Sequence, residues 1–361
     1  MAAVYSIIGI TFAFALALTP VTIKLAHKFN LVDIPSDNRR IHKKPMPRIG
    51  GVAIVVSMFL GFLIYYIFTK NIESIALDKK FFGYAIGAFI IALMGIIDDI
   101  FNLRARYKFF FQLAAGIVIY AFGIRITGFK IPFIYTDIIN FEWIDFPVTL
   151  TWVIGITNAV NLIDGLDGLA AGISSISATA LLIIFIATSA SLDAIIITAV
   201  LVGATLGFLP YNFNPAKTFM GDVGSNFLGF TLSIVSILGF AKGYTIIAIL
   251  IPILALGVPI FDTLFAMVRR FVKGQPMLKP DGAHVHHRLL KRGLNQRQAV
   301  LLLYAITSAL CILSVVMISA DIWKLLLLIL ALICFVVIGI LSMKSNKQNN
   351  DDIKDEFKHK T

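Results

Sequence analysis

Long apolar segments recur along almost the whole chain and constrain its fold more than any other feature. They approach or exceed the roughly 18 residues that a helix needs to cross a bilayer. The chain is 58% hydrophobic and 14% charged, which lies outside the usual range of soluble domains. Segments of this length do not fit the short alternating strands of a membrane β-barrel. We therefore predict an all-α, polytopic integral membrane protein.

About eleven membrane spans are expected, and ten is the alternative count. Their approximate ranges are 4–23, 49–68, 81–97, 109–126, 147–163, 169–189, 193–210, 226–241, 244–268, 299–319 and 323–343. We expect residues 1–343 to form a single transmembrane domain. The tail, 344–361, is polar and mixed in charge, which predicts a disordered cytosolic segment.

The basic residues predict the orientation of the spans, because cytosolic loops collect lysine and arginine. With the N-terminus outside, 24 of the 31 basic residues and 13 of the 20 acids fall on the cytosolic side. The whole formal net charge of +11 then lies on that side. The asymmetry either only sets topology and favours anionic headgroups, or also attracts a multiply charged anion. Nucleic acid is not an expected partner, because no basic domain stands apart from the spans.

The run NAVNLIDGLDG places two amides and two carboxylates at the end of an apolar span, where polar groups are costly. In a helix Asn158, Asn161 and Asp164 recur every three residues and share one arc. Such a cluster of oxygen ligands suits Mg²⁺ and a phosphorylated substrate. The alternative is a turn that caps the next helix, which explains Asp167 better than it explains all four residues.

Two adjacent carboxylates, Asp98 and Asp99, end the third span in the run GIIDDIFNLRARYK. They repel each other unless a cation or basic groups neutralise them. One interpretation is a helix end held by salt bridges to Arg104, Arg106 and Lys108. The other is one Mg²⁺ ligand and one group oriented to a substrate.

Asp222 stands between Gly221 and Gly224, where a further span begins in the run YNFNPAKTFMGDVGSN. This position presents a carboxylate beside free backbone N–H groups. A simple helix cap is the alternative. Phe219, three residues earlier, has the ordinary interpretation of an aromatic side chain at the membrane interface.

The loop before the second span contains proline and is rich in basic residues. Lys43, Lys44 and Arg48 either anchor the topology or hold the oxygens of a phosphate. A separate acid, Asp262, lies inside the expected ninth span. An intramembrane acid either serves the function of the protein or pairs with a neighbouring helix.

Three histidines form an H-x-H-H motif before the tenth span, and Arg288 follows them. Zinc is not favoured, because no cysteine accompanies the histidines and a carboxylate set suited to hard metals is already present. We expect His284, His286 and His287 to hold a pyrophosphate or to donate a proton or hydrogen bond to it. Surface imidazoles without a function are the alternative.

These motifs together resemble those of the polyprenyl-phosphate N-acetylhexosamine-1-phosphate transferases, glycosyltransferase family 4. The resemblance covers about the first 320 residues and rests on PMPRIGG, GIIDDIFNLRARYK, NAVNLIDGLDGLAAG, NPAKTFMGDVGS, PIFDT and HVHHRLLKRG in this order. Within the superfamily the chain is similar to the bacterial branch that uses UDP-N-acetylglucosamine (UDP-GlcNAc) and undecaprenyl phosphate. The H-x-H-H form departs from the three consecutive histidines of the muramoyl-pentapeptide branch.

The resemblance implies transfer of GlcNAc-1-phosphate to undecaprenyl phosphate at the cytosolic face of a bacterial cytoplasmic membrane. It implies Mg²⁺ as the cofactor, with Mn²⁺ as an alternative. The implied partners are UDP-GlcNAc, undecaprenyl phosphate and the lipid bilayer, and a homodimer is an open alternative. The product would begin an envelope polymer such as teichoic acid or the O-antigen of lipopolysaccharide. Alternative functions are phospho-MurNAc-pentapeptide transfer, transfer of another UDP-HexNAc sugar phosphate, and transport of a phosphorylated or lipid-linked solute.

The resemblance also assigns roles within the domain at 1–343, which it makes catalytic. The expected catalytic residues are Asp98, Asp99, Asp164 and His287, and the expected metal ligands are Asp222, Asp98, Asp99 and Asp164. The expected nucleotide and substrate contacts are Lys43, Lys44, Asn158, Asn161, Asp167, Asn212, Phe219, His284, His286 and Arg288. Phe219 is expected to stack on the uracil ring.

Overall fold

The computed structural model describes residues 2–33, 45–69, 78–129, 139–140, 143–240, 246–272, 274 and 284–318. Residues Met1–Val315 form one compact unit, and Val316–Thr361 form a second unit that lies almost entirely outside the described residues. Several features predicted from the sequence lie outside the described residues. They concern the eleventh span at 323–343, the tail at 344–361, and the side chains of Lys43 and Lys44.

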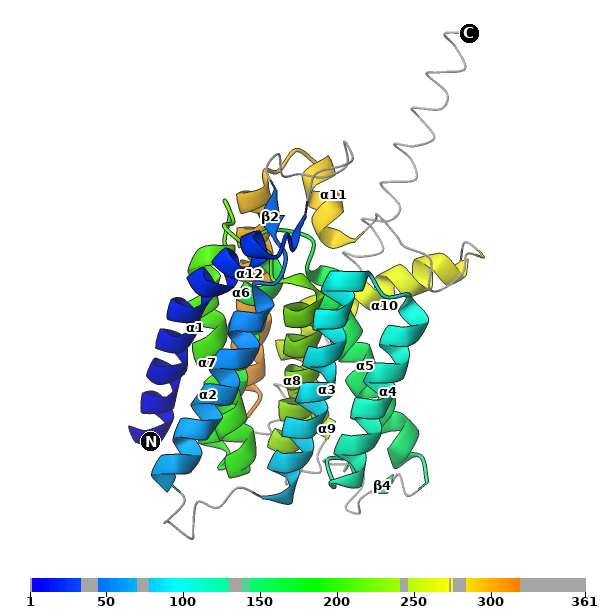
Figure 1. Cartoon of the computed structure of the whole chain (residues 1–361). Helices are drawn as coiled ribbons and strands as arrows, with labels where there is room; N and C mark the ends of the chain where they lie inside the picture. The colour runs from blue at the N-terminus through cyan, green and yellow to red at the C-terminus, as the bar shows by residue number, and fades with distance from the viewer. Residues whose placement is uncertain are drawn as a thin grey trace, which may run out of the picture. The chain divides into compact units, whose positions relative to one another are not determined.

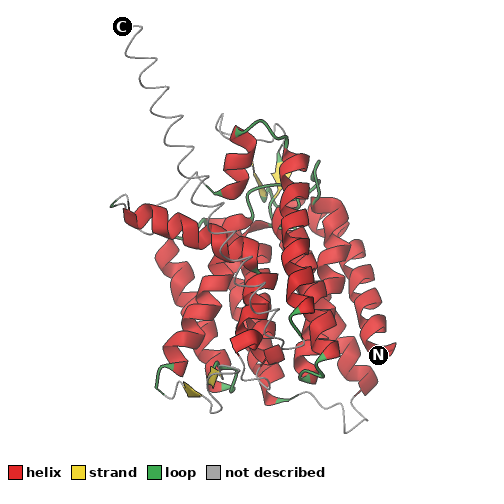
Figure 2. Cartoon of the chain, turned by 180° about the vertical axis from the view of Figure 1, so that it is seen from behind, coloured by secondary structure: helices red, strands yellow, loops and turns green. Residues whose placement is uncertain are grey.

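Helices make up nearly all of the first unit (Figures 1 and 2). They are α1 (Ala2–Lys28), α2 (Gly51–Thr69), α3 (Lys79–Phe101), α4 (Ala105–Ala121), α5 (Asp145–Ile163), α6 (Leu169–Ala187), α7 (Leu192–Asn212), α8 (Gly221–Phe240), α9 (Ile246–Ala255), α10 (Gly257–Val272), α11 (Val285–Lys291) and α12 (Gln296–Val316). Two short antiparallel pairs join β1 (Val32–Asp33) to β2 (Met46–Pro47) and β3 (Gly128–Phe129) to β4 (Ile139–Asn140). The predicted all-α class is confirmed.

Eight of the described helices are long and apolar enough to cross a membrane, namely α1, α2, α3, α5, α6, α7, α8 and α12. Helix α4 has 17 residues and lies beside α3 and α5 in the same bundle (Figure 1). The expected polytopic membrane architecture is therefore confirmed. The total of about eleven spans and the outside position of the N-terminus stay predictions.

The ninth span, expected at 244–268, is not one continuous helix. Helix α9 ends at Ala255, Leu256 forms a turn, and α10 begins at Gly257. Pro259 has no N–H to continue the hydrogen-bond ladder of α9, but proline fits well in the first turn of a new helix. Helix α10 lies crosswise to the long helices (Figure 1). The expectation of one continuous span at 244–268 is wrong for this physical reason.

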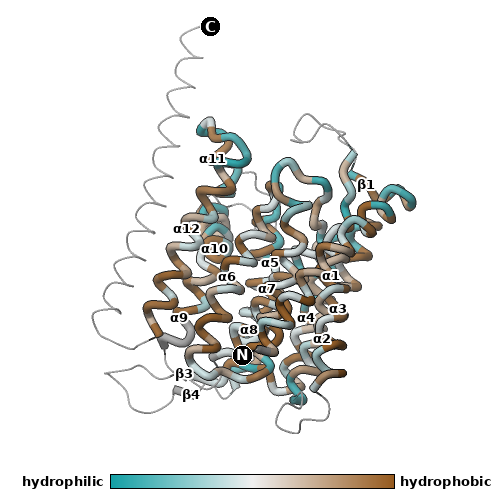
Figure 3. The backbone as a smooth tube through the Cα atoms, turned by 90° about the vertical axis from the view of Figure 1, so that its left-hand side faces the viewer, coloured by the Kyte–Doolittle hydropathy of each residue, from teal (hydrophilic) through white to brown (hydrophobic). Residues whose placement is uncertain are grey.

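Helix α8 is the central helix of the bundle. It packs against α3, α5, α7, α2 and α6, and its described side chains from Val223 onward are buried. The start of α8 lies at the end of the bundle that also carries β2 and α11 (Figure 1). Figure 3 shows hydrophobic residues along the helices and the longest hydrophilic stretches at this same end. The segments predicted to carry chemistry therefore meet at one end of the bundle, which we call the polar end.

A close approach between α3 and α8 sets the position of that end. A Cβ added to Gly95 of α3 would lie 2.2 Å from the Cα atom and 2.7 Å from the backbone N atom of Val223. Real Cβ atoms do not come this close to backbone, so only glycine allows the two helices to touch here. Asp98 and Asp99 follow one turn later on α3, facing the start of α8.

Substitution of this glycine tests the helix contact. We expect Gly95→Ala to push α3 and α8 apart and to lower the free energy of unfolding by about 1–3 kcal/mol, as overpacking usually does. Gly155→Ala on α5 is the matched control, because an added Cβ there would meet nothing within 4 Å. The control should be neutral or more stable by up to about 1 kcal/mol, from helix propensity. Thermal unfolding in detergent measures both, and equal behaviour of the two variants would contradict the close approach.

Candidate active site at the polar end

A cavity of about 830 Å³ opens at the polar end of the bundle. This volume is in the range of pockets that bind small molecules. Its wall includes four acids and two groups able to carry positive charge, namely Asp33, Asp164, Asp167, Asp222, Arg48 and His287. Seven of the residues predicted for the site line it, namely Asn161, Asp164, Asp167, Asn212, Phe219, Asp222 and His287.

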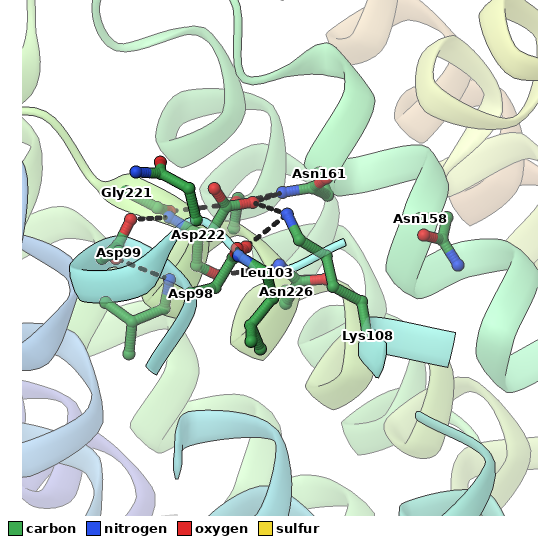
Figure 4. Close-up of polar contacts among 12 residues, drawn as sticks. Asp98, Asp99, Leu103, Lys108, Asn158, Asn161, Gly221, Asp222 and Asn226 are labelled. Carbon is green, nitrogen blue, oxygen red and sulfur yellow. Dashed lines mark hydrogen bonds and ion pairs between the residues drawn. The ribbon is translucent and has the colours of Figure 1, made fainter. Parts of the chain in front are cut away.

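Asp222 lies in the first turn of α8 and is the point where three helices meet (Figure 4). Its Oδ1 atom accepts a hydrogen bond of 2.8 Å from Nδ2 of Asn161 on α5. The same oxygen lies 3.3 Å from Nζ of Lys108 on α4. Asp222 and Asn161, predicted from separate motifs, are therefore in direct contact.

Asp99 caps the start of α8 (Figure 4). Its Oδ1 atom accepts the backbone N–H of Asp222 at 2.9 Å, and its Oδ2 atom accepts that of Val223 at 3.1 Å. Gly221 has a φ of +71°, and a Cβ there would lie 2.5 Å from Oδ2 of Asp99. A carboxylate in this position satisfies free N–H groups and favours the positive end of the helix dipole. Because both oxygens already accept hydrogen bonds, Asp99 is placed to position Asp222, and the structure does not give it a place in the cavity wall.

Asp98 is 2% exposed and does not line the cavity either. Its Oδ1 atom accepts the backbone N–H of Leu103 at 2.8 Å, and its Oδ2 atom forms an ion pair with Lys108. Lys108 thus bridges Asp98 and Asp222 (Figure 4). The sequence motif offered salt bridges or a metal as alternatives for this aspartate pair, and in the structure the salt bridge to Lys108 is present.

Asp164 follows the last residue of α5 and lies on the cavity wall. Among the described residues, nothing donates a hydrogen bond to its carboxylate. Burial and, after it, the charges of Asp222, Asp99 and Asp167 raise the pKa of Asp164 to about 8. Ionisation of this group is thus opposed by its acidic neighbours, and a bound cation would relieve that repulsion.

The cavity wall supplies hard oxygen ligands for a divalent cation. In the part of the chain that the structure describes, no three carboxylate or imidazole groups converge where one metal ion would lie. The predicted ligand set of Asp98, Asp99, Asp164 and Asp222 is therefore not preformed, because the first two have the partners described above. Mg²⁺ often binds through one or two carboxylates together with substrate phosphates. Asp164 and Asp222 fit that arrangement.

Asp167 holds the loop between α7 and α8. Its Oδ2 atom accepts hydrogen bonds from Nδ2 of Asn214 at 3.0 Å and from the backbone N–H of Ala216 at 3.2 Å. The same Nδ2 donates to Oε1 of Gln296 at 3.0 Å. Asn214 and Gln296 line the cavity, and neither was among the residues predicted for the site. The run YNFNPAK offered a signal for Asn214, whereas nothing in the sequence distinguishes Gln296.

The other two residues predicted near a nucleotide also belong to this loop region. Asn212 is buried and donates from Nδ2 to the carbonyl of Thr218 at 3.0 Å. Phe219 lines the cavity, and its backbone N–H donates to the carbonyl of Pro47 at 2.8 Å. The hairpin of β1 and β2 is therefore joined to the loop that carries Phe219. Stacking of Phe219 on uracil stays a prediction.

The structure separates the three histidines of the H-x-H-H motif. His287 alone of the three lines the cavity. His284 is buried, and its Nδ1 atom lies 2.9 Å from Oδ2 of Asp262. The other carboxylate oxygen of Asp262, Oδ1, accepts the backbone N–H of Val285 at 2.8 Å. His284 therefore joins α10 to α11 and is not positioned to contact a ligand in the cavity.

His286 is buried behind the cavity wall, where a Cβ on Gly165 would lie 2.3 Å from its Nε2 atom. Burial, and then the neighbouring His287, lower the pKa of His286 to about 4. His286 is therefore neutral near pH 7 and does not supply a positive charge to a pyrophosphate, which corrects that part of the prediction. Arg288 belongs to α11 and is not part of the cavity wall.

The prediction that Asn158 contacts the nucleotide or substrate is also not supported by its position. It does not line the cavity, and its Nδ2 atom donates to Oε1 of Gln112 and to the carbonyl of Ile154, both at 2.8 Å. Helical spacing correctly puts Asn158 on the same side of α5 as Asn161. One turn of helix, however, takes it away from Asn161 and Asp222 (Figure 4), to Gln112 on α4.

Arg48 supplies a positive charge on the cavity wall. It follows β2, and its Nη1 atom donates to Oδ1 of Asn102 at 3.1 Å. Within the described part of the chain no carboxylate lies within ion-pair distance of its guanidinium, so donors remain for an anionic ligand. The sequence had grouped Arg48 with Lys43 and Lys44 as an alternative phosphate contact.

The raised pKa of Asp164 predicts a pH-dependent stability. Between pH 4 and 8 the folded protein keeps a proton on Asp164 that the unfolded chain has lost, so stability falls as the pH rises. Asp164→Asn removes this loss. In buffer without divalent cations we expect Asp164→Asn to unfold a few degrees above the wild type at pH 8.5, with a much smaller difference in unfolding temperature at pH 5. Differential scanning fluorimetry measures the difference, and a gap that is equal at both pH values would contradict the assignment.

Comparison with known proteins identifies the family of the chain. Residues 81–240 match glycosyl transferase family 4. The chain is 44% identical over 323 residues to the probable undecaprenyl-phosphate N-acetylglucosaminyl 1-phosphate transferase of Bacillus subtilis (strain 168), covering 90% of this chain and 87% of that protein. It is 34% identical over 299 residues to the decaprenyl-phosphate N-acetylglucosaminephosphotransferase of Mycolicibacterium smegmatis, covering 78% and 73%.

A third relative is the undecaprenyl-phosphate alpha-N-acetylglucosaminyl 1-phosphate transferase of Thermotoga maritima. The two chains are 31% identical over 296 residues, which cover 79% of this chain and 81% of that protein. Each of the three alignments is much longer than the matched family region. The chain therefore belongs to glycosyl transferase family 4, the polyprenyl-phosphate N-acetylhexosamine-1-phosphate transferases, and to its bacterial undecaprenyl-phosphate GlcNAc-1-phosphate transferase branch.

Proposed function

We propose that this multi-pass cell-membrane protein transfers GlcNAc-1-phosphate from UDP-GlcNAc to undecaprenyl phosphate. The observation that carries the proposal is the cavity at the polar end, where Asp164, Asp222 and Arg48 face one space. A water-soluble nucleotide sugar reaches such a cavity from one side of the membrane, and a lipid phosphate held at headgroup level reaches it from the bilayer. The printed names of the relatives supply the identity of both substrates.

In the proposed reaction an oxygen of the lipid phosphate attacks the β-phosphorus of UDP-GlcNAc. The new bond joins this oxygen to the β-phosphorus, and the bond between the β-phosphorus and the bridging oxygen breaks. UMP leaves with that oxygen, and undecaprenyl-diphospho-GlcNAc is the other product. The reaction needs positioning and charge neutralisation more than it needs covalent chemistry from the protein.

We propose Mg²⁺ as the cofactor, held by Asp164 and Asp222, with Mn²⁺ as an alternative. When bound, the ion neutralises charge on the transferring phosphoryl group and on the leaving UMP. Arg48 is placed to bind phosphate oxygens, and Lys108 holds the Asp222 carboxylate in place. His287 is a further residue of the cavity wall that can contact a substrate. Asp99 fixes the start of α8 and so fixes Asp222.

We propose direct displacement without a general base. A phosphomonoester has a second pKa of about 6, so the lipid phosphate is already largely dianionic near neutrality. The two hydrogen bonds to Asp99 support this view, because its oxygens are engaged with the backbone of α8. The cytosolic orientation of the polar end and the start of a teichoic acid or O-antigen polymer are proposals that follow from the function, and a homodimer is a separate proposal.

A substrate panel tests the proposed function. Purified protein in detergent is mixed with Mg²⁺, undecaprenyl phosphate and one of UDP-GlcNAc, UDP-GalNAc or UDP-MurNAc-pentapeptide, and UMP release is measured. We expect release with UDP-GlcNAc to exceed release with the other two by about tenfold or more, which is the discrimination that polar substrate contacts provide. Butanol-extractable product without a sealed compartment separates an enzyme from a transporter. Absence of UMP with UDP-GlcNAc and Mg²⁺ contradicts the function and the cofactor.

Asp99→Asn tests the direct displacement. The new amide would place an NH₂ group against the N–H groups of α8, so we expect activity to fall by roughly tenfold or more through misplacement of Asp222. The loss should be the same at pH 6 and pH 8 in a pH–rate profile. Asp145→Asn is the control, because Asp145 is also a buried acid but accepts from Tyr120 far along α5 from the cavity. Recovery of Asp99→Asn to wild-type activity at pH 8 alone would identify Asp99 as a base.

A further inference from the structure

Three amide side chains from three helices form a buried hydrogen-bonded cluster below the cavity. Gln112 of α4 accepts from Nδ2 of Asn158 on α5 at 2.8 Å and donates from Nε2 to Oδ1 of Asn226 on α8 at 3.2 Å. The same Nε2 lies 3.4 Å from Oδ1 of Asn158. Gln112 is 2% exposed and Asn226 is 1% exposed. We call Gln112, Asn158 and Asn226 the amide cluster.

A cluster of this kind fixes how helices slide and rotate against one another. Apolar contacts inside a membrane bundle are tolerant of small shifts, because lipid and leucine are equally apolar. A buried amide tolerates less, because a shift that breaks its hydrogen bond leaves an unsatisfied polar group. The cluster therefore favours a single register of α4, α5 and α8 at its own level.

Each member of the amide cluster stands one helical turn from a residue of the site. Gln112 comes four residues after Lys108 on α4, and Asn158 comes three residues before Asn161 on α5. Asn226 comes four residues after Asp222 on α8, and its Nδ2 atom donates to the carbonyl of Asp222 at 2.8 Å. Residues three or four apart lie on the same face of a helix.

The three site residues one turn above the cluster also meet one another. Asp222 Oδ1 lies 2.8 Å from Nδ2 of Asn161 and 3.3 Å from Nζ of Lys108 (Figure 4). Helices α4, α5 and α8 are thus joined at two levels. The amide cluster joins them at the lower level, and the contacts of the charged Asp222 carboxylate join them one turn above. The amides keep their form across the pH range, whereas the upper contact has to change when a cation or an anionic substrate arrives.

We propose that the amide cluster is a positioning device that sets the register of α4, α5 and α8 and thereby aims Lys108 and Asn161 at Asp222. The proposal rests on the proposed function and extends it to Gln112 and Asn226, which do not line the cavity. It assigns Asn158 to positioning in place of the substrate contact that the sequence suggested. The cluster acts through Lys108, Asn161 and Asp222, so its loss impairs turnover more than it impairs binding of the nucleotide.

Two single variants and one control test the proposal. Gln112→Met keeps the length of the side chain and removes all of its hydrogen bonds, and Asn158→Leu does the same at a partly exposed position. Thr231→Val is the matched control, because Thr231 on α8 is buried and makes a hydrogen bond of 3.1 Å to Tyr84 on α3, more than two turns beyond Asp222. All three variants lose an interhelical hydrogen bond.

For each variant we measure the unfolding temperature, kcat, and KM for UDP-GlcNAc and undecaprenyl phosphate. We expect all three variants to lose similar stability. Gln112→Met and Asn158→Leu should lower kcat by about tenfold or more, the scale of a small misplacement in a site, with KM for UDP-GlcNAc changed less than about threefold. Thr231→Val should keep kcat within about twofold. The double variant Gln112→Met with Asn158→Leu should lose no more activity than the worse single variant, because the residues act as one unit.

Three results would overturn the proposal. The first is a wild-type kcat in Gln112→Met or in Asn158→Leu. The second is a loss of kcat in Thr231→Val equal to that of the cluster variants at the same unfolding temperature. The third is a double variant whose loss of activity is the sum of the two single losses. If Gln112→Met does not fold, Asn158→Leu decides the question. Failure of the proposed function is a separate result, because it appears as absent turnover of UDP-GlcNAc by the wild type. In that case the variants are compared with the UDP-sugar that the wild type does use.

Discussion

The contact between the Asp99 carboxylate and the first N–H groups of α8 is the interaction on which the site depends. It joins the end of α3 to the start of the most buried helix and places Asp222 at the cavity wall. It is possible only because Gly95 lets the helices touch and because Gly221 leaves room for the carboxylate. A charged group is costly at the edge of a membrane, but here the free end of a helix supplies the hydrogen bonds and the favourable dipole that compensate it.

The remaining charges at the polar end follow from the same geometry. Fixing Asp222 beside Asp99 also brings it close to Asp98 and Asp164, so the acids repel one another. Lys108 compensates Asp98 and Asp222, but nothing among the described residues compensates Asp164, and its pKa is raised. The protein is thus folded around an acid whose ionised form is disfavoured by burial and by its acidic neighbours, a cost of the kind that binding sites accept for function.

The sequence predicts most of the fold, because a membrane-spanning helix can be recognised from the length and apolar character of its own segment, without knowledge of its neighbours. It also predicts Asn161, Asp164, Asp167 and Asp222 as neighbours, because polar residues at membrane ends have few structural uses. It fails where a role depends on the partner. Asn158 and Asn161 look equivalent in one helix, and only the position of Gln112 on another helix separates the amide cluster from the cavity.

The break in the predicted ninth span changes the position and the contacts of Asp262. As part of a continuous helix, Asp262 would lie inside the membrane, where an acid needs a special reason. Because the chain turns at Leu256 and α10 runs crosswise, Asp262 instead reaches His284 and the start of α11. That contact holds α11 at the cavity with His287 on the wall and His286 behind it. The acid and the histidines, which the sequence presents as separate candidates, are therefore one structural unit.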